Sequence, residues 1–440
     1  MSRREIEARF AAVRNTLFTH IENAGRIKVV KAPPGSGKTH LLLEAVEHAQ
    51  KQGARIAVAT QTNSQAEDIC RRLAAKHVRV NTIRFAADAA IKPCDFPASV
   101  TWQTKANALP HTPCVVVGTA AKWGLVSLAG PFDFLFVEEA WQLAWADFML
   151  LAQVSSRFVL IGDPGQIPPV VSIDVSRWQT APVAPHRPAP QQILDSHAAA
   201  NPCLSLPATR RLPHDTAALI RPFYEFSFES FAGPGERRVT ATGPRRDAYD
   251  AVIDLLAGGS TAAMSLSTPF GGPPLELDDE VATGAVNVVE RLLDRGAVAE
   301  IDGENQLLQP SDIGICATHR VMNAAMQLRL RKGLRNIVRV DTPERWQGLQ
   351  CKVMVVVHPL SGIVEPSGFD LETGRLCVMA SRHRAGLILI GRDHIGSTLR
   401  DYLPVADQAP GCEDIVGRGH ERNRRFWETL EDAGRVISAA

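Results

Sequence analysis

The stretch from Val29 to Gln50, "VVKAPPGSGKTHLLLEAVEHAQ", has the residue types of a phosphate-binding loop. Glycines in such a loop let backbone N–H groups close around an anion at the start of a helix. Lys38 would reach the β- and γ-phosphates of a nucleotide, and the hydroxyl of Thr39 would hold Mg²⁺. Ala32 stands where the usual pattern opens with Gly. We expect the phosphates to contact Pro34, Gly35, Ser36, Gly37, Lys38 and Thr39.

Two successive acids end an apolar run in "FDFLFVEEAWQ". A nucleotide site needs one carboxylate at a strand end to hold Mg²⁺ and a second to orient or deprotonate water. Glu138 fits the first role and Glu139 the second. The alternative is a solvated acidic turn, but the apolar run and the preceding phosphate-binding loop favour the catalytic interpretation.

A third apolar run leads into a loop in "VLIGDPGQIPPVV". Asp163 and Gln166 follow the run, at the end of a strand where open α/β sheets place their ligands. Pro168 and Pro169 would stiffen this loop. Together with the first two motifs, the segment makes Gln166 a candidate sensor of the γ-phosphate.

Strands that end at one edge of a sheet must position these side chains. Short β-branched runs such as "IKVV", "RIAVAT" and "CVVVGT" alternate with helical stretches such as "HLLLEAVEHA". A second alternating set begins near "AAMSLS" and includes "IGICAT", "CKVMVVVH" and "LILIGRD". This alternation is typical of parallel sheets covered by helices. The sequence therefore predicts an α/β protein with two such domains.

The bulk composition is close to neutral and ordinary for a globular chain. Among 440 residues there are 48 Lys and Arg against 47 Asp and Glu, so a nucleic-acid partner would need a locally basic groove. The eight cysteines form no CxxC pair, which disfavours a zinc module and fits the reduced thiols of the cytoplasm. The charged N-terminal stretch is unlike a signal peptide, and no apolar run is long enough to cross a membrane. We therefore expect a cytoplasmic protein without a membrane partner.

The motifs and their order resemble those of superfamily 1 helicases, in particular the branch of the nonsense-mediated-decay helicase. "EEAWQ" is similar to motif II, usually Asp-Glu-Ala-x-Gln, and "GDPGQIPP" to motif III with Ile for Leu. "VDTPERWQGLQ" resembles motif V, and "GRLCVMASRHRAGLILIGRD" resembles motif VI. The resemblance covers most of the chain, from Ile27 to about Arg400. It implies two RecA-like P-loop domains with ATP and Mg²⁺ in the cleft between them.

The first half holds further segments that resemble helicase motifs. "VATQTNSQAEDI" is similar to motif Ia and "VVVGTAAKWG" to motif Ib. "LPATRRLP" resembles a segment whose Arg contacts the γ-phosphate. Aligning the segment from Leu206 assigns this role to Arg211, whereas aligning it backwards from "FY" at 223–224 assigns it to Arg210. We prefer Arg211. By resemblance, the residues that contact the backbone of a single strand are Thr60, Thr62, Asn63 and Thr119.

Motifs V and VI supply the expected residues of the second domain. The resemblance places Thr342, Gln347 and Gly348 between the single strand and the nucleotide, and Trp346 is a candidate to stack on a base. In motif VI, Arg382 takes the position of the arginine finger and Arg384 the later nucleotide-contacting position. Three further features depart from the family: Gln350 replaces a frequent Glu, the Pro-Tyr and Gln of motif IV are missing, and no Gln precedes Gln50 to recognise adenine.

These features predict an ATP-dependent helicase or translocase that acts on single-stranded DNA or RNA, with 5′→3′ movement if the branch resemblance holds. The alternative is an ATP-gated clamp or scaffold with little hydrolysis, since motif II has Glu138 and the adenine-reading Gln is absent. A small-molecule kinase or GTPase is disfavoured, because no Asn-Lys-x-Asp guanine reader occurs and motifs V and VI would have no role. Hydrolysis is assigned to Lys38, Glu139, Gln166, Arg211 and Arg382.

We expect the first domain at 1–232, with a Pro-rich surface loop at 179–190, then a linker at 233–258. The second domain is expected at 259–404, followed by a C-terminal helical tail at 405–440. The segments that could carry an added domain, before Ile27 and between Cys70 and Pro113, are short. No wedge for splitting a duplex is therefore evident. We expect poor unwinding by the chain alone and a partner protein that supplies strand separation or targeting.

Overall fold

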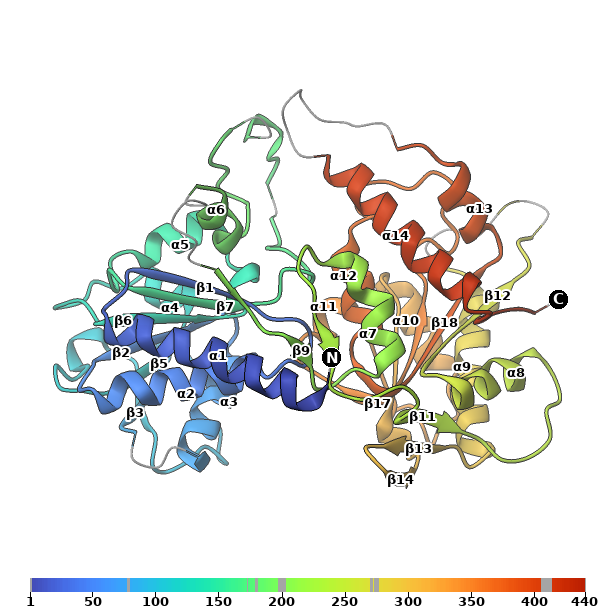
Figure 1. Ribbon diagram of the computed structural model, residues 1–440, viewed down its shortest axis with the longest axis horizontal. Helices are drawn as coiled ribbons and strands as arrows, with labels where there is room; N and C mark the ends of the chain where they lie inside the picture. Colours follow the sequence, from blue (N-terminus) through green and yellow to red (C-terminus); the bar gives the residue numbers. More distant parts are fainter. Residues whose placement is uncertain are drawn as a thin grey trace. The chain divides into compact units, whose positions relative to one another are not determined.

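The chain divides into two compact units. A computed structural model describes residues 2–76, 80–171, 173–178, 181–196, 203–269, 272, 277–404 and 414–439. The first unit contains Met1–Pro164 and Pro168–Pro207, and the second contains Gly165–Ile167 and Ala208–Ala440. Each unit is built on a large parallel sheet with helices on both faces (Figure 1). The predicted α/β fold class is confirmed.

The sheet of the first unit has the strand order β4-β3-β5-β2-β6-β7-β1-β8, and every pairing in it is parallel. Its central strands are mostly apolar and are buried along their whole length, because helices cover both faces of the sheet. Strand β7 lies between β1, which leads into the phosphate-binding loop, and β6, which carries the two acids. The strands are β1 (Ile27–Lys31), β2 (Ile56–Thr60), β3 (Thr82–Phe85), β4 (Thr101–Gln103), β5 (Val115–Thr119), β6 (Phe134–Glu138), β7 (Phe158–Gly162) and β8 (Cys203–Ser205).

Two hydrophobic clusters join the helices of the first unit to its sheet. Leu17, Leu42 and Ile69 come from three helices that pack on one face of the sheet. On the other face, Trp123 and Phe148 belong to the second cluster. The first face carries α1 (Arg3–Glu22), α2 (Lys38–Lys51) and α3 (Asn63–Lys76), and the second carries α4 (Ala120–Gly124), α5 (Trp145–Leu151) and α6 (Ala189–Ser196).

The main sheet of the second unit has the order β16-β15-β17-β18-β12-β19 and is also parallel. A smaller antiparallel sheet, β11-β13-β14, belongs to the same unit. The strands of these two sheets are β11 (Arg237–Thr240), β12 (Thr261–Leu266), β13 (Val298–Ile301), β14 (Glu304–Leu307), β15 (Ile313–Cys316), β16 (Arg339–Asp341), β17 (Cys351–Val357), β18 (His383–Arg392) and β19 (Val436–Ala439). A short parallel pair consists of β9 (Ala208–Thr209) and β10 (Glu229–Ser230).

Helices cover both faces of the second sheet as well. One cluster contains the apolar faces of α8 (Ala248–Leu255), α9 (Asp279–Asp294) and α10 (Arg320–Arg329). The other contains those of α7 (His214–Ile220), α12 (Thr373–Ala380), α13 (His394–Asp401) and α14 (Ile415–Asp432). The short helix α11 (Pro343–Trp346) follows β16. None of the described helices combines the length and apolar character needed to cross a membrane.

Several segments differ from the domain plan drawn from the sequence. Residues 208–232 cluster with the second unit, and 233–258 contains β11 and α8, so this region is a folded part of that unit and no linker. Within 179–190, Gln179 and Thr180 lie outside the described residues, and Ala189 already begins α6. Within 405–440, residues 405–413 lie outside the described residues, and the remainder forms α14 and the sheet strand β19. Gly/Pro-rich composition suggested a linker, but long-range strand pairing decided the fold.

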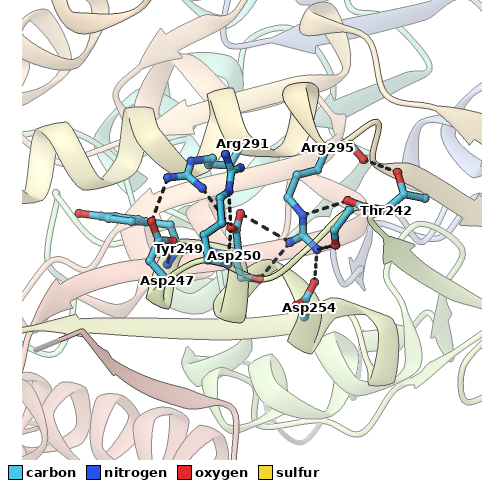
Figure 2. Close-up of polar contacts among 9 residues, drawn as sticks. Thr242, Asp247, Tyr249, Asp250, Asp254, Arg291 and Arg295 are labelled. Carbon is cyan, nitrogen blue, oxygen red and sulfur yellow. Dashed lines mark hydrogen bonds and ion pairs between the residues drawn. The ribbon is translucent and has the colours of Figure 1, made fainter.

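A network of charged side chains ties α8 to α9 and to the loop before α8 (Figure 2). The guanidinium of Arg295 donates to the backbone oxygens of Thr242 and Asp250, at 3.1 and 3.2 Å, and to the carboxylate of Asp254 at 2.8 Å. Arg291 donates to the buried carboxylate of Asp250 at 3.0 Å and to Asp247 at 2.9 Å. Because the Arg295 side chain is only 5% exposed, water cannot replace its hydrogen bonds.

We predict that Arg295→Met destabilises the second unit by about 3 kcal/mol or more, because buried carbonyl oxygens lose their donors and a buried ion-pair network is broken. The matched control is Arg331→Met, which removes an Arg that is 50% exposed and pairs with Glu290 and Asp294 of the same helix α9. The control should cost less than about 1 kcal/mol. Urea denaturation followed by circular dichroism measures the free energy of unfolding of both variants. Hydrogen exchange of the α8 and α9 amides shows whether the loss is local to these helices. Equal losses for the two variants would contradict the prediction.

Candidate functional site

The loop between β1 and α2 has the backbone of an anion cradle. Gly35 and Gly37 have φ angles of +67° and +89°, in the left-handed region that glycine adopts without strain. A Cβ added at Gly37 would meet no atom within 4 Å, so the backbone conformation, and not space, requires glycine there. Ser36 is buried, and its hydroxyl has no hydrogen-bond partner among the described residues. A buried hydroxyl of this kind is suited to a ligand oxygen.

The two acids at the end of β6 contact the first two residues of α2. The Nζ atom of Lys38 lies 2.5 Å from Oε1 of Glu139. The hydroxyl of Thr39 donates to Oε1 of Glu138 at 2.5 Å. Both glutamates are buried, at 6% and 7% exposure. The structure thus brings together four of the side chains that were predicted to bind and hydrolyse the nucleotide. Glu138 contacts Thr39, and Glu139 contacts Lys38.

The two glutamates also differ in the pKa of Glu138 and in the backbone conformation of Glu139. Burial, helped by the neighbouring charge of Glu139, raises the pKa of Glu138 to about 7, although Thr39 and Lys38 act in the opposite direction. Glu138 is therefore partly protonated at neutral pH until a cation stabilises its charged form. Glu139 has a φ angle of +50°, a strained conformation for a residue with a side chain. Such strain costs roughly 1–3 kcal/mol and is concentrated at functional sites.

The donor set of this loop fits a nucleotide with Mg²⁺. Mg²⁺ prefers oxygen ligands, and the Thr39 hydroxyl and Glu138 carboxylate are two such oxygens side by side. The ammonium of Lys38 and the backbone N–H groups of the glycine-rich loop would hold phosphate oxygens. Lys38 would then exchange the Glu139 carboxylate for a phosphate. Bound Mg²⁺ would supply charge neutralisation of the phosphates.

The motif III segment is divided between the two units. Asp163 follows β7 in the first unit and is 2% exposed. Gln166, expected in the first domain, clusters with the second unit through the Gly165–Ile167 segment. There the Gln166 carbonyl approaches Gly374 of α12 so closely that a Cβ on that glycine would lie 2.7 Å from it. The assignment of Gln166 to the first domain is therefore corrected, because its neighbours are residues far along the chain.

The predicted nucleic-acid residues of the first unit lie at one edge of its sheet, where β2 and β5 end. Thr60 and Thr119 are register partners in these two adjacent strands. Thr119 caps α4 by accepting the Lys122 N–H at 3.2 Å, and Thr62 and Asn63 are exposed at the start of α3. Thr60 differs from the expectation: it is fully buried, and its hydroxyl donates to the Thr62 carbonyl at 3.0 Å. Thr60 therefore shapes the loop, and only Thr62, Asn63 and Thr119 of this set reach the surface.

Trp346 is the clearest correction in the second unit. It is only 3% exposed, its indole N–H donates to the Ile315 carbonyl at 3.1 Å, and its ring fills the space beside Gly314 on β15. The ring is part of the core and cannot stack on a base. Thr342, at the start of α11, is also largely buried at 9% exposure. After α11, Gly348 is exposed with a φ of +79°, and Gln347 is partly buried.

The arginines of motif VI and of the "LPATRRLP" segment come together in the second unit. Arg211 donates to Gln350 Oε1 at 3.1 Å and to the Ser381 carbonyl at 3.3 Å, one residue before Arg382. Arg210 instead lies over the ring of Phe231 at 4.6 Å, so the geometry favours Arg211 as the member of this group. Sequence analysis identified Gln350 only as a departure from the family. In the structure, its side-chain oxygen accepts the hydrogen bond that orients Arg211.

Arg382 and Arg384 have different surroundings. Arg382 is 2% exposed, and its Nε atom donates to the Val378 carbonyl at 3.2 Å. Its Nη2 atom has no hydrogen-bond partner among the described residues. Arg384 is 41% exposed and lies 3.8 Å from the carboxylate of Asp302. A buried guanidinium with an unused donor is suited to an anion, which distinguishes Arg382 from Arg384.

Comparison with known proteins gives one family match and several similar structures. A family model described as an AAA domain matches residues 13–179, which is less than half of the chain and contains the phosphate-binding loop and both acids of β6. No curated protein matches the sequence. The family match supports a P-loop nucleotide-binding domain in the first unit.

Several similar solved structures are viral helicases. The structure of the PRRSV helicase shares 17% identity with a TM-score of 0.41, over 86% of this chain and 54% of that chain. Arterivirus nonstructural protein 10 (helicase) shares 15% identity with a TM-score of 0.43, over 86% of this chain and 63% of that chain. Its complex structure with DNA shares 14% identity with a TM-score of 0.42, over 87% of this chain and 65% of that chain. This chain thus spans between half and two thirds of those proteins. At such TM-scores the likeness carries no functional argument, and the nonsense-mediated-decay branch stays a prediction.

We predict different defects for the two glutamates. Glu139→Gln should bind ATP but hydrolyse it slowly, since the water-orienting carboxylate is lost while Thr39 and Glu138 remain paired. Glu138→Gln should instead weaken Mg²⁺-dependent nucleotide binding. Titration with a fluorescent ATP analogue, with and without Mg²⁺, and single-turnover hydrolysis measure the two effects. If Glu138→Gln traps ATP and Glu139→Gln does not, the two roles are reversed.

Proposed function

We propose that the chain is a nucleic-acid-stimulated ATPase of the helicase type, which moves along single-stranded DNA or RNA. The observation that carries this proposal is the double pairing of Lys38 with Glu139 and of Thr39 with Glu138. It supplies one cation for phosphate, two oxygens for Mg²⁺ and one carboxylate for water. The AAA-domain match over 13–179 supports the nucleotide-binding part of the proposal.

Features of the second unit favour a helicase-type motor over a simple P-loop hydrolase. Arg211 and Arg382 lie on a second parallel α/β unit, on segments joined through Ser381. In the proposed mechanism, Arg382 is the finger that stabilises charge at the transferred phosphoryl group. The exposed Thr62 and Asn63 and the partly buried Thr119 would contact the backbone of the strand. Opening and closing of the nucleotide site would then be coupled to movement along that strand.

A second candidate is an ATP-gated clamp with slow turnover, and one observation favours it. Because burial raises the pKa of Glu138 to about 7, a fraction of the metal-binding carboxyl is protonated at neutral pH. Slow turnover that accelerates as pH rises through 7, without stimulation by single strands, would support the clamp. Robust hydrolysis that single-stranded DNA or RNA stimulates would support the motor.

We also propose that a partner protein separates the strands of a duplex. Efficient strand displacement on a tailed duplex by the chain alone would contradict the need for such a partner.

We predict that Lys38→Ala abolishes ATP turnover, since the loop loses its only side-chain cation for the phosphates. The matched control is Lys51→Ala, at the opposite end of α2, where the side chain is 64% exposed and pairs with Glu47. Steady-state hydrolysis is measured in parallel with single-stranded DNA, single-stranded RNA and duplex. Near-normal turnover by Lys38→Ala would overturn the assignment of the phosphate-binding loop.

Arg382→Ala should retain nucleotide affinity better than turnover, because a finger acts mainly on transition-state charge. Loss of such an arginine costs roughly 10³–10⁵ in rate. Analogue binding and single-turnover hydrolysis are compared for this variant and for Arg384→Ala, whose side chain is exposed. If Arg384→Ala is the damaging change and Arg382→Ala is mild, the alignment of "ASRHRAG" is shifted by two residues.

A further inference from the structure

Arg237, the first residue of β11, joins three separate segments of the second unit. Its side chain is 3% exposed. Its Nε and Nη2 atoms donate to the two carboxylate oxygens of Asp302 at 2.8 and 2.9 Å. Its Nη1 atom donates to the backbone carbonyls of Arg210, at 2.9 Å, and Arg211. A planar, bidentate pair of this kind fixes both distance and orientation.

Asp302 lies in the tight turn between β13 and β14. Its φ angle is +56° and that of Gly303 is +88°, as an Asp-Gly turn between antiparallel strands requires. The strand register, with Ile301 opposite Glu304, fixes this turn. The hairpin thereby presents the Asp302 carboxylate to Arg237, and the same carboxylate lies 3.8 Å from Arg384.

The contacts continue from Arg237 into the group of arginines assigned to the nucleotide. Arg237 holds the Arg211 carbonyl, while the Arg211 side chain donates to Gln350 and to the Ser381 carbonyl. Ser381 directly precedes Arg382. An unbroken path therefore runs from the hairpin turn to the segments that carry Arg211 and Arg382. Neither Arg237 nor Asp302 belongs to any motif recognised in the sequence.

We propose that Arg237 and Asp302 are positioning residues that hold Arg211 in the orientation needed for phosphate contact. This inference rests on the proposed function, in which Arg211 contacts the γ-phosphate. The hairpin formed by β13 and β14 then has a role in nucleotide turnover, although neither residue touches the nucleotide. Displacement of a catalytic group by about 1 Å can reduce a rate by about 10²-fold. Loss of the Asp302 carboxylate releases Arg237 and with it the 210–211 backbone.

The neighbouring residue on β11 offers a matched control. Arg238 pairs with Glu300 at 2.7 Å, so this ion pair joins the same strands, β11 and β13. Arg238 is 42% exposed, and within the described part of the chain its side chain pairs with Glu300 and makes no hydrogen bond to the 210–211 backbone. A role limited to fastening β13 onto β11 predicts that neither Asp302→Asn nor Glu300→Gln changes the kcat of the folded protein. A positioning role predicts a kinetic defect for Asp302→Asn only.

The experiment measures kcat and KM for ATP, the Kd of a non-hydrolysable ATP analogue and the urea midpoint for Asp302→Asn, Glu300→Gln and Arg237→Gln. We expect Asp302→Asn and Arg237→Gln to lower kcat by about 10-fold or more, in line with misplacement of a catalytic group. Glu300→Gln should leave kcat within about twofold of wild type. Asp302→Asn should lower the urea midpoint more than Glu300→Gln, because Arg237 is 3% exposed and Arg238 is 42% exposed; kcat is therefore compared without urea, on variants that circular dichroism shows to be folded. Equal kcat losses for these two variants would overturn the inference.

A double-mutant cycle with Arg211→Ala identifies the route of the effect. If Asp302 acts through Arg211, Asp302→Asn should cause no further loss of turnover in the Arg211→Ala background. An undiminished loss in that background would overturn the positioning role. Arg237→Gln leaves the contact of Asp302 with Arg384 in place, so a defect in this variant excludes an effect through Arg384 alone. A wild-type chain without ATP turnover would overturn the proposed function itself, whereas an active wild type with a silent Asp302→Asn would overturn only this inference.

Discussion

The contact of the phosphate-binding loop with the end of β6 is the interaction on which the first unit's chemistry depends. Three ionisable side chains and one hydroxyl meet there through the pairs Lys38–Glu139 and Thr39–Glu138. The pairs form because β1 and β6 are parallel and one strand, β7, separates them, so both end at the same edge of the sheet. Burial at this edge strengthens each electrostatic contact and raises the pKa of Glu138 to about 7. The fold thus determines both the distance between the groups and the raised pKa of Glu138.

The local part of this site could be predicted from the sequence, since it depends on strand, loop and helix signals close along the chain. The glycines of the loop, the apolar run before Glu138 and the alternation of strands and helices are all local patterns. Their outcome, two α/β units with parallel sheets, is confirmed. Thr39 and Glu138 were each expected to hold Mg²⁺, and in the structure their side chains are hydrogen-bonded at 2.5 Å.

The features that sequence reasoning missed depend on contacts between residues far apart in the chain. Trp346 looked available beside Gln347, but its ring packs on β15 beside Gly314. The segment at 233–258 looked like a linker from its Gly, Pro and Arg content, yet β11 pairs with β13 about 60 residues later. Gln166 follows a strand of the first unit but clusters with the second. Composition and spacing carry no information on such partners.

The order of the segments along the chain has a consequence for folding during synthesis. All strands and helices of the first unit end before Ala208, so this unit can fold while the remainder is still being translated. Ile167, however, is buried in the hydrophobic cluster of the second unit, whose β12 pairs with β19 at Val436–Ala439. The apolar side chain of Ile167 therefore cannot be buried until residues much later in the chain have been synthesised. During that interval the motif III segment exposes an apolar side chain that the complete protein buries.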